Sequence, residues 1–240
     1  MATRLNTLSR PIGPNHAGST APGLRLLARE ALSFAYMRTS ATFASNVAVD
    51  VEGNDHPVVV LPGFMASDQT TSRLRRSLSS AGFRAHGWGL GRNNGIKSDM
   101  LERFGERIVA LDAGTPLTLV GWSLGGLIAR EYAKHAPHQI AKVVTLGSPF
   151  SGDLRANNAW RLYELVAGHK IESPPIDTIL SEKPPVPTYA IWSKRDGVVA
   201  PDSARGLHHE SDYRVELDCT HMAFVAQPDS IRAIAKAIIG

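Results

Sequence analysis

The sequence has little cysteine, little excess charge and no long apolar run, and each shortage excludes a class of protein. Cys219 is the single cysteine among 240 residues, so no disulfide can form within the chain and a disulfide-stapled scaffold is excluded. No segment approaches the roughly 18 to 20 consecutive apolar residues that a membrane-spanning helix needs. Because one cysteine also fits a reducing compartment, we expect a cytoplasmic protein.

The charges of the chain are nearly balanced. It carries 26 lysines and arginines against 22 aspartates and glutamates, a formal net charge of +4. No zinc-finger, RNA-recognition or basic-zipper pattern is present, so we expect no nucleic-acid partner. The sequence also lacks H-E-x-x-H and G-x-G-x-x-G. We therefore expect neither a metal ion nor a nucleotide cofactor.

The chain begins with a segment that cannot bury much apolar surface. Residues 1–23 hold three prolines and three glycines among polar residues, which predicts a flexible N-terminal tail. An organelle transit peptide is the alternative, because Glu30 is the first acidic residue. The apolar spacing over residues 24–36 then predicts an amphipathic helix. We expect this helix to pack on the domain edge, with weak contact to a membrane surface as the alternative.

From residue 57 onward, short apolar runs alternate with helix-length amphipathic segments. Strands are predicted at 57–61, 83–88, 117–120, 140–146, 188–192 and 213–217, and helices at 68–80, 97–111, 124–135 and 230–239. Ser67 or Asp68 is the expected N-cap of the first of these helices. This order predicts an α/β fold with a mostly parallel, doubly wound sheet and helices on both faces. No linker interrupts it, so residues 24–240 are expected to form one domain.

The alternation stops between residues 151 and 184. This interval holds a helical stretch at 157–167 and a proline-rich return. It follows a strand end, where open α/β sheets bind ligands, and long insertions in compact folds are commonly functional. We therefore expect residues 151–184 to form a short cap over the site, and a surface loop is the alternative.

The most informative motif is GWSLGG at residues 121–126. It matches G-x-S-x-G and lies between a predicted strand and a predicted helix. A sharp strand-to-helix turn of this kind exposes the central side chain at the edge of the sheet, and small glycines relieve the crowding. The following helix directs its N-terminal amides at the site, which favours developing negative charge. The motif therefore predicts that Ser123 is a nucleophile, and a purely structural turn is the alternative.

A nucleophilic serine needs a histidine as its base, and the chain order expected here is serine, acid, histidine. Six of the nine histidines follow Ser123, and four of these lie after residue 150. His221 lies after the last predicted strand and before the final helix, at the carboxyl end of that strand. His208 and His209 precede the strand, and His169 belongs to the insertion. His221 is the predicted base.

The base needs an orienting carboxylate. Asp196 follows the predicted strand at 188–192, again at a carboxyl end, and Gly197 allows a tight turn there. Asp202 lies six residues further along and Asp218 adjoins the last strand. Both remain alternatives, and Asp196 is the predicted acid.

Two backbone amides are needed to stabilise the oxyanion that forms when an acyl carbonyl is attacked. Leu124, directly after the nucleophile, supplies one by its position. The loop after the first predicted strand is expected to supply the other, because Gly63 permits a tight turn that directs the amide of Phe64 inward. Met65 is the neighbouring alternative.

Together these residues resemble the α/β-hydrolase superfamily, and within it the bacterial lipases and esterases. The resemblance runs from about residue 58 to the C-terminus, through LPGFMASD, GWSLGG, VVTLGSPF, SKRDGVV and CTHMAF. It implies the α/β-hydrolase fold, and it places the nucleophile, acid, base and two oxyanion donors at Ser123, Asp196, His221, Phe64 and Leu124. One pair departs from many lipases, which have His-Gly where this chain has Pro62-Gly63.

The predicted function is a cofactor-free serine hydrolase of carboxylic esters, which forms and then hydrolyses an acyl-enzyme. The alternatives are a thioesterase or acyltransferase on the same triad, and a hydrolase-fold binding protein whose triad is idle. Large apolar side chains near the strand ends indicate a substrate pocket, to which we assign Met65, Trp88, Trp122 and Phe150. The expected partner is a small-molecule or lipid ester.

Overall fold

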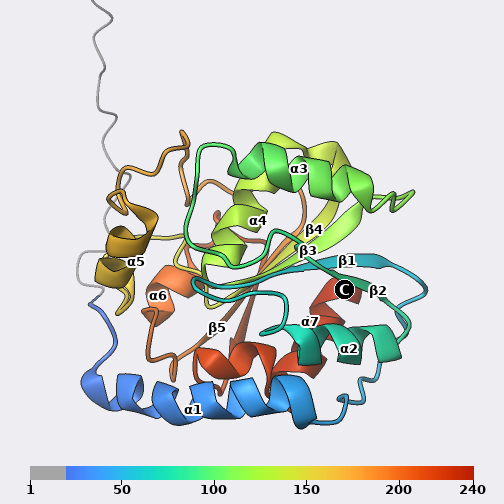
Figure 1. Ribbon diagram of the computed structural model, residues 1–240, viewed down its shortest axis with the longest axis horizontal. Helices are drawn as coiled ribbons and strands as arrows, with labels where there is room; N and C mark the ends of the chain where they lie inside the picture. Colours follow the sequence, from blue (N-terminus) through green and yellow to red (C-terminus); the bar gives the residue numbers. More distant parts are fainter. Residues whose placement is uncertain (1–19) are drawn as a thin grey trace, which may run out of the picture.

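A parallel sheet forms the centre of the computed structural model, which describes residues 20–240. Its six strands follow the order β2-β1-β3-β4-β5-β6, and every neighbouring pair is parallel. Helices cover both faces of the sheet (Figure 1). The predicted doubly wound α/β architecture is confirmed. Of the tail predicted at residues 1–23, residues 1–19 lie outside the described residues.

The strands match the predicted apolar runs closely. They are β1 (Pro57–Leu61), β2 (Arg84–Gly87), β3 (Leu117–Trp122), β4 (Ile140–Leu146), β5 (Thr188–Ser193) and β6 (Tyr213–Leu217). Every residue of β1, β3 and β5 is buried, as continuous apolar runs predict for strands covered on both faces. β6 is partly exposed and lies at one edge of the sheet, as its alternating sequence predicts.

The helices divide between two hydrophobic cores, one on each face of the sheet (Figure 1). Their bounds are α1 (Leu24–Phe43), α2 (Ser72–Ser80), α3 (Met100–Ala110), α4 (Leu124–His135), α5 (Trp160–Ala167), α6 (Pro201–Arg205) and α7 (Pro228–Ile239), with 3₁₀ turns η1 (Pro137–Gln139) and η2 (Met222–Val225). One core holds side chains of α1, α2 and α7, among them Leu78 and Ile234. The other holds α3 and α4, whose Phe104 and Tyr132 rings meet edge to face.

Two helix bounds differ most from the prediction, the start of α2 and the end of α1. α2 begins at Ser72, and neither Ser67 nor Asp68 caps it. The Asp68 carboxylate instead accepts the backbone N–H groups of Trp88 and Gly89, each at 3.0 Å. The Asp68 carboxylate therefore joins two loops and does not cap the first turn of α2. α1 also runs seven residues beyond the predicted end at 36, to Phe43.

The interval from 151 to 184 contains one helix, α5, and is otherwise made of turns and irregular backbone. This helix lies at one end of the molecule (Figure 1). The interval therefore does break the alternation of strands and helices. Within residues 20–240, no helix is long and apolar enough to cross a membrane.

Candidate active site

Ser123 occupies a strained turn between β3 and α4. Its backbone has φ 55° and ψ −121°, a conformation that a residue with a side chain rarely adopts. The flanking glycines are required by close backbone approach. A Cβ on Gly121 would lie 2.3 Å from Gly126 Cα, and one on Gly125 would lie 2.5 Å from the Leu61 carbonyl oxygen. The G-x-S-x-G pattern is thus the sequence that this turn demands, and it leaves Ser123 partly exposed.

Asp196 and His221 form a buried pair. The His221 Nδ1 atom lies 2.7 Å from Asp196 Oδ2, and the two residues are 2% and 1% exposed respectively. Since an ionised carboxylate can only accept, Nδ1–H is the donor and Nε2 remains for another partner. The second oxygen, Asp196 Oδ1, accepts the backbone N–H groups of Val198 and Val199, each at 2.8 Å. The carboxylate is therefore held at both oxygens.

The environment of His221 favours its protonated form. Burial alone would lower the pKa of the imidazole, but the charge and hydrogen bond of Asp196, together with the charge of Glu30, hold that pKa above its ordinary value. A histidine with a raised pKa is a stronger base than one in water. This is the property that proton abstraction from a serine hydroxyl needs.

The turn at Ser123 and the loop of His221 lie side by side. The Trp122 indole N–H donates to the His221 carbonyl oxygen at 3.1 Å, and their ring centroids are 5.6 Å apart. The Ser123 N–H donates to the Leu146 carbonyl oxygen at 2.8 Å. A Cβ on the following residue, Gly147, would lie 2.9 Å from Asp196 Oδ2 and 3.1 Å from His221 Nδ1. The carboxyl ends of β3, β4, β5 and β6 therefore gather the three predicted residues at one edge of the sheet.

The competing acids and bases have other partners. Asp202 pairs with Arg205 at 2.7 Å and Asp218 with Arg195 at 3.0 Å, both near the surface. The three histidines that competed with His221 lie elsewhere: His169 contacts the Ile96 carbonyl oxygen, His208 contacts Arg214, and His209 is exposed. Of the predicted candidates, Asp196 is the one whose carboxylate contacts His221.

Two unpaired backbone donors flank Ser123. Within residues 20–240, the N–H groups of Phe64 and Leu124 have no acceptor in the protein. The Met65 N–H is already used, because it donates to the Asn93 carbonyl oxygen at 2.7 Å. A Cβ on Gly63 would lie 3.3 Å from Ser123 Cβ, so this loop closely approaches the serine. Phe64, rather than the alternative Met65, has the amide that remains free for an oxyanion.

Asn93 is a residue that sequence reasoning missed. It is fully buried, and its Nδ2 atom donates to the Pro62 carbonyl oxygen at 2.8 Å. Its backbone N–H donates to the Ala66 carbonyl oxygen at 2.8 Å, and its own carbonyl oxygen accepts the Met65 N–H. Asn93 therefore supports the loop that holds Phe64. The signal in the sequence was a polar residue within a glycine-rich segment, which is weak by itself.

Ser123 opens into an apolar cavity. The core side of its lining comes from Phe64, Ile96, Leu124 and Leu127. The interval from 151 to 184 supplies seven further lining residues, Leu154, Asn157, Ala159, Tyr163, Ile171, Pro174 and Leu180. The Phe64 and Tyr163 rings are in contact, with centroids 5.4 Å apart. The interval therefore lines the space beside the serine.

The structure corrects the predicted pocket residues, none of which lines this cavity. Trp88, Trp122 and Phe150 are at most 3% exposed and pack in the cores. Arg130 stacks over the Phe150 ring at 4.1 Å, and the Trp88 indole N–H donates to a backbone carbonyl oxygen. Met65 is 40% exposed. The rings of Trp88, Trp122 and Phe150 pack in the cores, and the cavity wall consists mainly of aliphatic side chains together with Phe64 and Tyr163.

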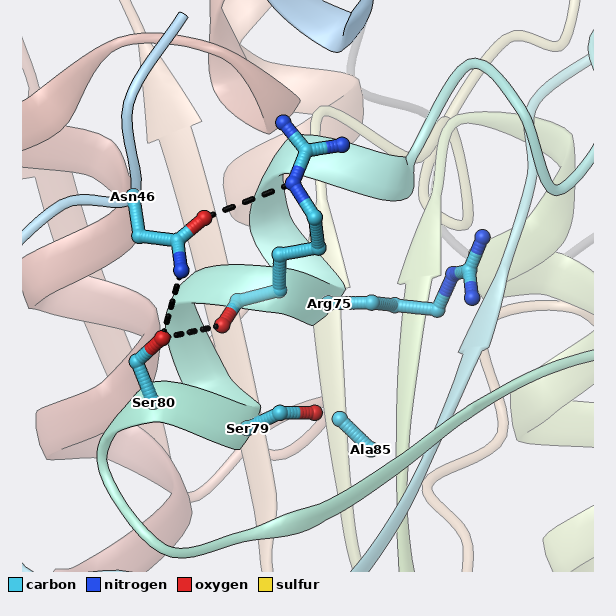
Figure 2. A pocket seen from close by; sticks show the side chains of 6 residues that line it. Asn46, Arg75, Ser79, Ser80 and Ala85 are labelled. Carbon is cyan, nitrogen blue, oxygen red and sulfur yellow. Dashed lines mark hydrogen bonds between the residues drawn. The ribbon is translucent and has the colours of Figure 1, made fainter.

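A second hollow lies on another part of the surface, lined by Asn46, Arg75, Arg76, Ser79, Ser80 and Ala85. Figure 2 shows Asn46 hydrogen-bonded to Ser80 there, at 2.6 Å. The Arg76 guanidinium is not free to bind a ligand in the hollow, because it donates to the carbonyl oxygens of Ala41 and Ala44. These contacts attach the end of α1 to α2. The residues that line the hollow do not form a catalytic or ligand-binding arrangement of the kind found at Ser123.

Comparisons with known proteins agree with this fold. A protein-family model described as "alpha/beta hydrolase fold" matches residues 56–168. The chain is similar to pimeloyl-(acyl-carrier protein) methyl ester esterases of Photobacterium profundum, at 29% identity over 46% of this chain and 43% of that protein, and of Sodalis glossinidius, at 34% identity over 39% and 37%. It thus spans less than half the length of these curated relatives. The carboxylesterase CesB of Bacillus subtilis has the same fold, with a TM-score of 0.54 and 13% identity over 90% of this chain and 98% of that chain.

The electrostatics of the buried pair predict how His221 titrates. We expect its pKa to lie above the ordinary histidine value of about 6.5, because Asp196 and Glu30 outweigh burial. Asp196→Asn should lower this pKa, measured by NMR of the imidazole nitrogens. Asp202→Asn is the control, since Asp202 is partly exposed and pairs with Arg205. A wild-type His221 pKa below the ordinary value would contradict the expectation.

Proposed function

Since the chain belongs to the α/β-hydrolase superfamily, we propose that it is a serine hydrolase of carboxylic esters that acts through an acyl-enzyme. One observation carries the proposal. The Asp196–His221 hydrogen bond of 2.7 Å lies beside the strained turn of Ser123, where an apolar cavity opens. A strained serine, a buried histidine–carboxylate pair and two free amides are what acyl transfer requires.

The mechanism assigns one task to each group. Ser123 Oγ attacks the acyl carbonyl carbon while His221 Nε2 takes the hydroxyl proton. Asp196 keeps Nδ1 protonated, so Nε2 is the basic nitrogen, and it stabilises the imidazolium that forms. The N–H groups of Phe64 and Leu124 donate to the oxyanion. His221 then protonates the leaving alcohol, and it later activates the water that hydrolyses the acyl-enzyme.

The cavity supports an ester with an apolar acyl part as the substrate. Its walls are mostly aliphatic or aromatic, and they come from both the core and the interval from 151 to 184. The similar proteins of Photobacterium profundum and Sodalis glossinidius are named as methyl ester esterases, which supports ester hydrolysis as the reaction. The alignments cover less than half of each chain, so they support the reaction and not a particular acyl group. The cytoplasmic location stays a prediction.

Replacing the proposed nucleophile tests the reaction directly. Ser123→Ala should abolish hydrolysis of p-nitrophenyl esters and labelling by a fluorophosphonate, because it removes the hydroxyl that we propose attacks the acyl carbonyl. The control is Ser79→Ala at an exposed position, which should retain both. Hydrolysis without dependence on Ser123 would refute the mechanism. A wild-type protein that is not labelled would indicate an idle triad.

The proposed acid has two internal controls. Asp196→Asn should lower kcat on the order of 10⁴-fold, because the imidazole then adopts the wrong tautomer. Asp202→Asn and Asp218→Asn should change kcat little, since both carboxylates pair with surface arginines. The measurement is kcat for one p-nitrophenyl ester in all three variants. A severe loss in either control with a small loss in Asp196→Asn would reassign the acid.

The cavity wall predicts where chain-length preference is set, and we propose that residues 151–184 act as a selective cap. Leu154→Trp should narrow the cavity and lower kcat/KM for long acyl chains relative to short ones, by about tenfold or more. Leu165→Trp is the matched control in the same interval, because Leu165 is 80% exposed and does not line the cavity. If the ratio of kcat/KM for long and short acyl chains is unchanged in Leu154→Trp, residues 151–184 do not select the acyl chain.

A further inference from the structure

α1 lies outside the part of the chain that aligns with the family model, yet it reaches the candidate site. It precedes β1 in the chain and runs beneath one face of the sheet (Figure 1). Within this helix, Glu30 is 4% exposed, a degree of burial that is rare for a carboxylate unless it is paired. None of the ion pairs formed by residues 20–240 includes Glu30.

The Glu30 carboxylate is hydrogen-bonded to three backbone N–H groups and not to a positively charged side chain. Glu30 Oε1 accepts the N–H of Gly197 and the N–H of His221, each at 2.7 Å, and Oε2 accepts the N–H of Met222 at 3.0 Å. Gly197 directly follows Asp196, so the donors come from the loop of the proposed acid and the loop of the proposed base. One side chain therefore bridges two loops that are also joined by the Asp196–His221 hydrogen bond and by the Arg195–Asp218 ion pair.

We propose that Glu30 is a positioning residue for this site, which ties the loop after β5 to the loop after β6 and so sets the Asp196–His221 hydrogen bond. The inference rests on the proposed function and names a residue that this function does not use. A neutral side chain would avoid the cost of burying a charge. The carboxylate offers lone pairs to three donors at once, which a neutral side chain of the same size cannot match.

The start of α1 packs closely against the loop after β5, which carries Asp196. A Cβ on Gly197 would lie 2.4 Å from the Leu26 carbonyl oxygen, so glycine is required where the helix backbone meets the loop. Asn158 Nδ2 donates both to the Pro22 carbonyl oxygen, at 2.9 Å, and to the Gly197 carbonyl oxygen, at 2.8 Å. The start of α1 is thereby fixed to the same loop that Glu30 binds.

The far part of α1 is anchored separately. Arg73 Nη1 donates to the Tyr36 hydroxyl at 2.7 Å and to the Ala226 carbonyl oxygen at 2.6 Å. Arg76 Nη1 donates to the Ala41 carbonyl oxygen at 2.8 Å. Because both ends of the helix are held, Glu30 between them has a fixed place from which to set the loops.

Glu30 also affects the proton affinity of His221. The charged groups that face the imidazole are Asp196 from the loop after β5 and Glu30 from α1, and both raise the His221 pKa against the effect of burial. The Cys219 thiol nearby stays neutral, because burial raises its pKa to about 12. Removing the Glu30 charge should therefore lower the His221 pKa while Asp196 remains. The base must be neutral to act, so the acid limb of kcat/KM should move to lower pH.

The test compares Glu30→Gln with the same substitution at exposed Glu52, in the full chain, with a p-nitrophenyl ester. Glu30→Gln should lower kcat on the order of 10²-fold, the loss expected when reacting groups shift by about 1 Å. It should leave KM nearly unchanged, because Glu30 does not line the cavity, and should move the acid limb to lower pH. Glu52→Gln should behave as wild type in all three measurements.

Glu30→Asp separates position from charge. It keeps the carboxylate but withdraws it by one methylene, so kcat should fall while the acid limb stays closer to that of wild type. Wild-type kcat and pH profile in Glu30→Gln, or wild-type kcat in Glu30→Asp, would overturn the inference. Loss of the thermal unfolding transition in both variants would assign Glu30 to stability alone and overturn it as well.

The inference and the proposed function fail in different ways. A wild-type protein without ester hydrolysis or fluorophosphonate labelling would refute the proposed function. In that event, NMR titration of His221 in Glu30→Gln still tests the link between α1 and the buried pair, and an unchanged His221 pKa would refute that link. An active wild type with unaffected Glu30 variants would refute the inference while leaving the proposed function in place.

Discussion

The loops that carry Asp196 and His221 can meet because all six strands of the sheet run parallel. In a parallel sheet, the carboxyl ends of neighbouring strands emerge at one edge, and the following loops converge there. β3 delivers Ser123 to this edge, β5 delivers Asp196 and β6 delivers His221. Residues that are far apart in the chain thus form one site, because each of them follows the carboxyl end of a strand.

Backbone N–H groups, rather than cations, balance the buried negative charge of this site. Asp196 is held by the amides of Val198 and Val199, and Glu30 by the amides of three residues in two loops. Dipoles from the backbone stabilise a carboxylate without neutralising its field. Both carboxylates therefore raise the proton affinity of one imidazole. A lysine or arginine in either place would have opposed the basicity that the proposed mechanism needs.

The Asp196–His221 pair and much of the cavity wall come from different parts of the fold. The proposed catalytic groups are fixed by strand ends and tightly packed glycines, where a single added carbon would clash with the backbone. Much of the cavity wall comes from the interval between 151 and 184, which contains one helix and much irregular backbone. Substitutions in this wall can alter the shape available to an acyl chain and leave the Asp196–His221 pair untouched. The proposed acid and base are thereby separate from the residues that we propose select the acyl chain.

Local patterns in the sequence determined the strands, the turn at Ser123 and the order of the proposed acid and base. A buried parallel strand must be a continuous apolar run, and the strained turn requires its flanking glycines. Each of these features can therefore be recognised from a few consecutive residues. Contacts between distant segments were decided by the tertiary structure alone. Asp68 binds the N–H groups of Trp88 and Gly89 and does not cap α2, and the large rings pack in the cores. Glu30 binds Gly197 and His221, which lie 167 and 191 residues further along the chain. No local pattern encodes such pairings, because their energy depends on which surfaces the folded chain brings together.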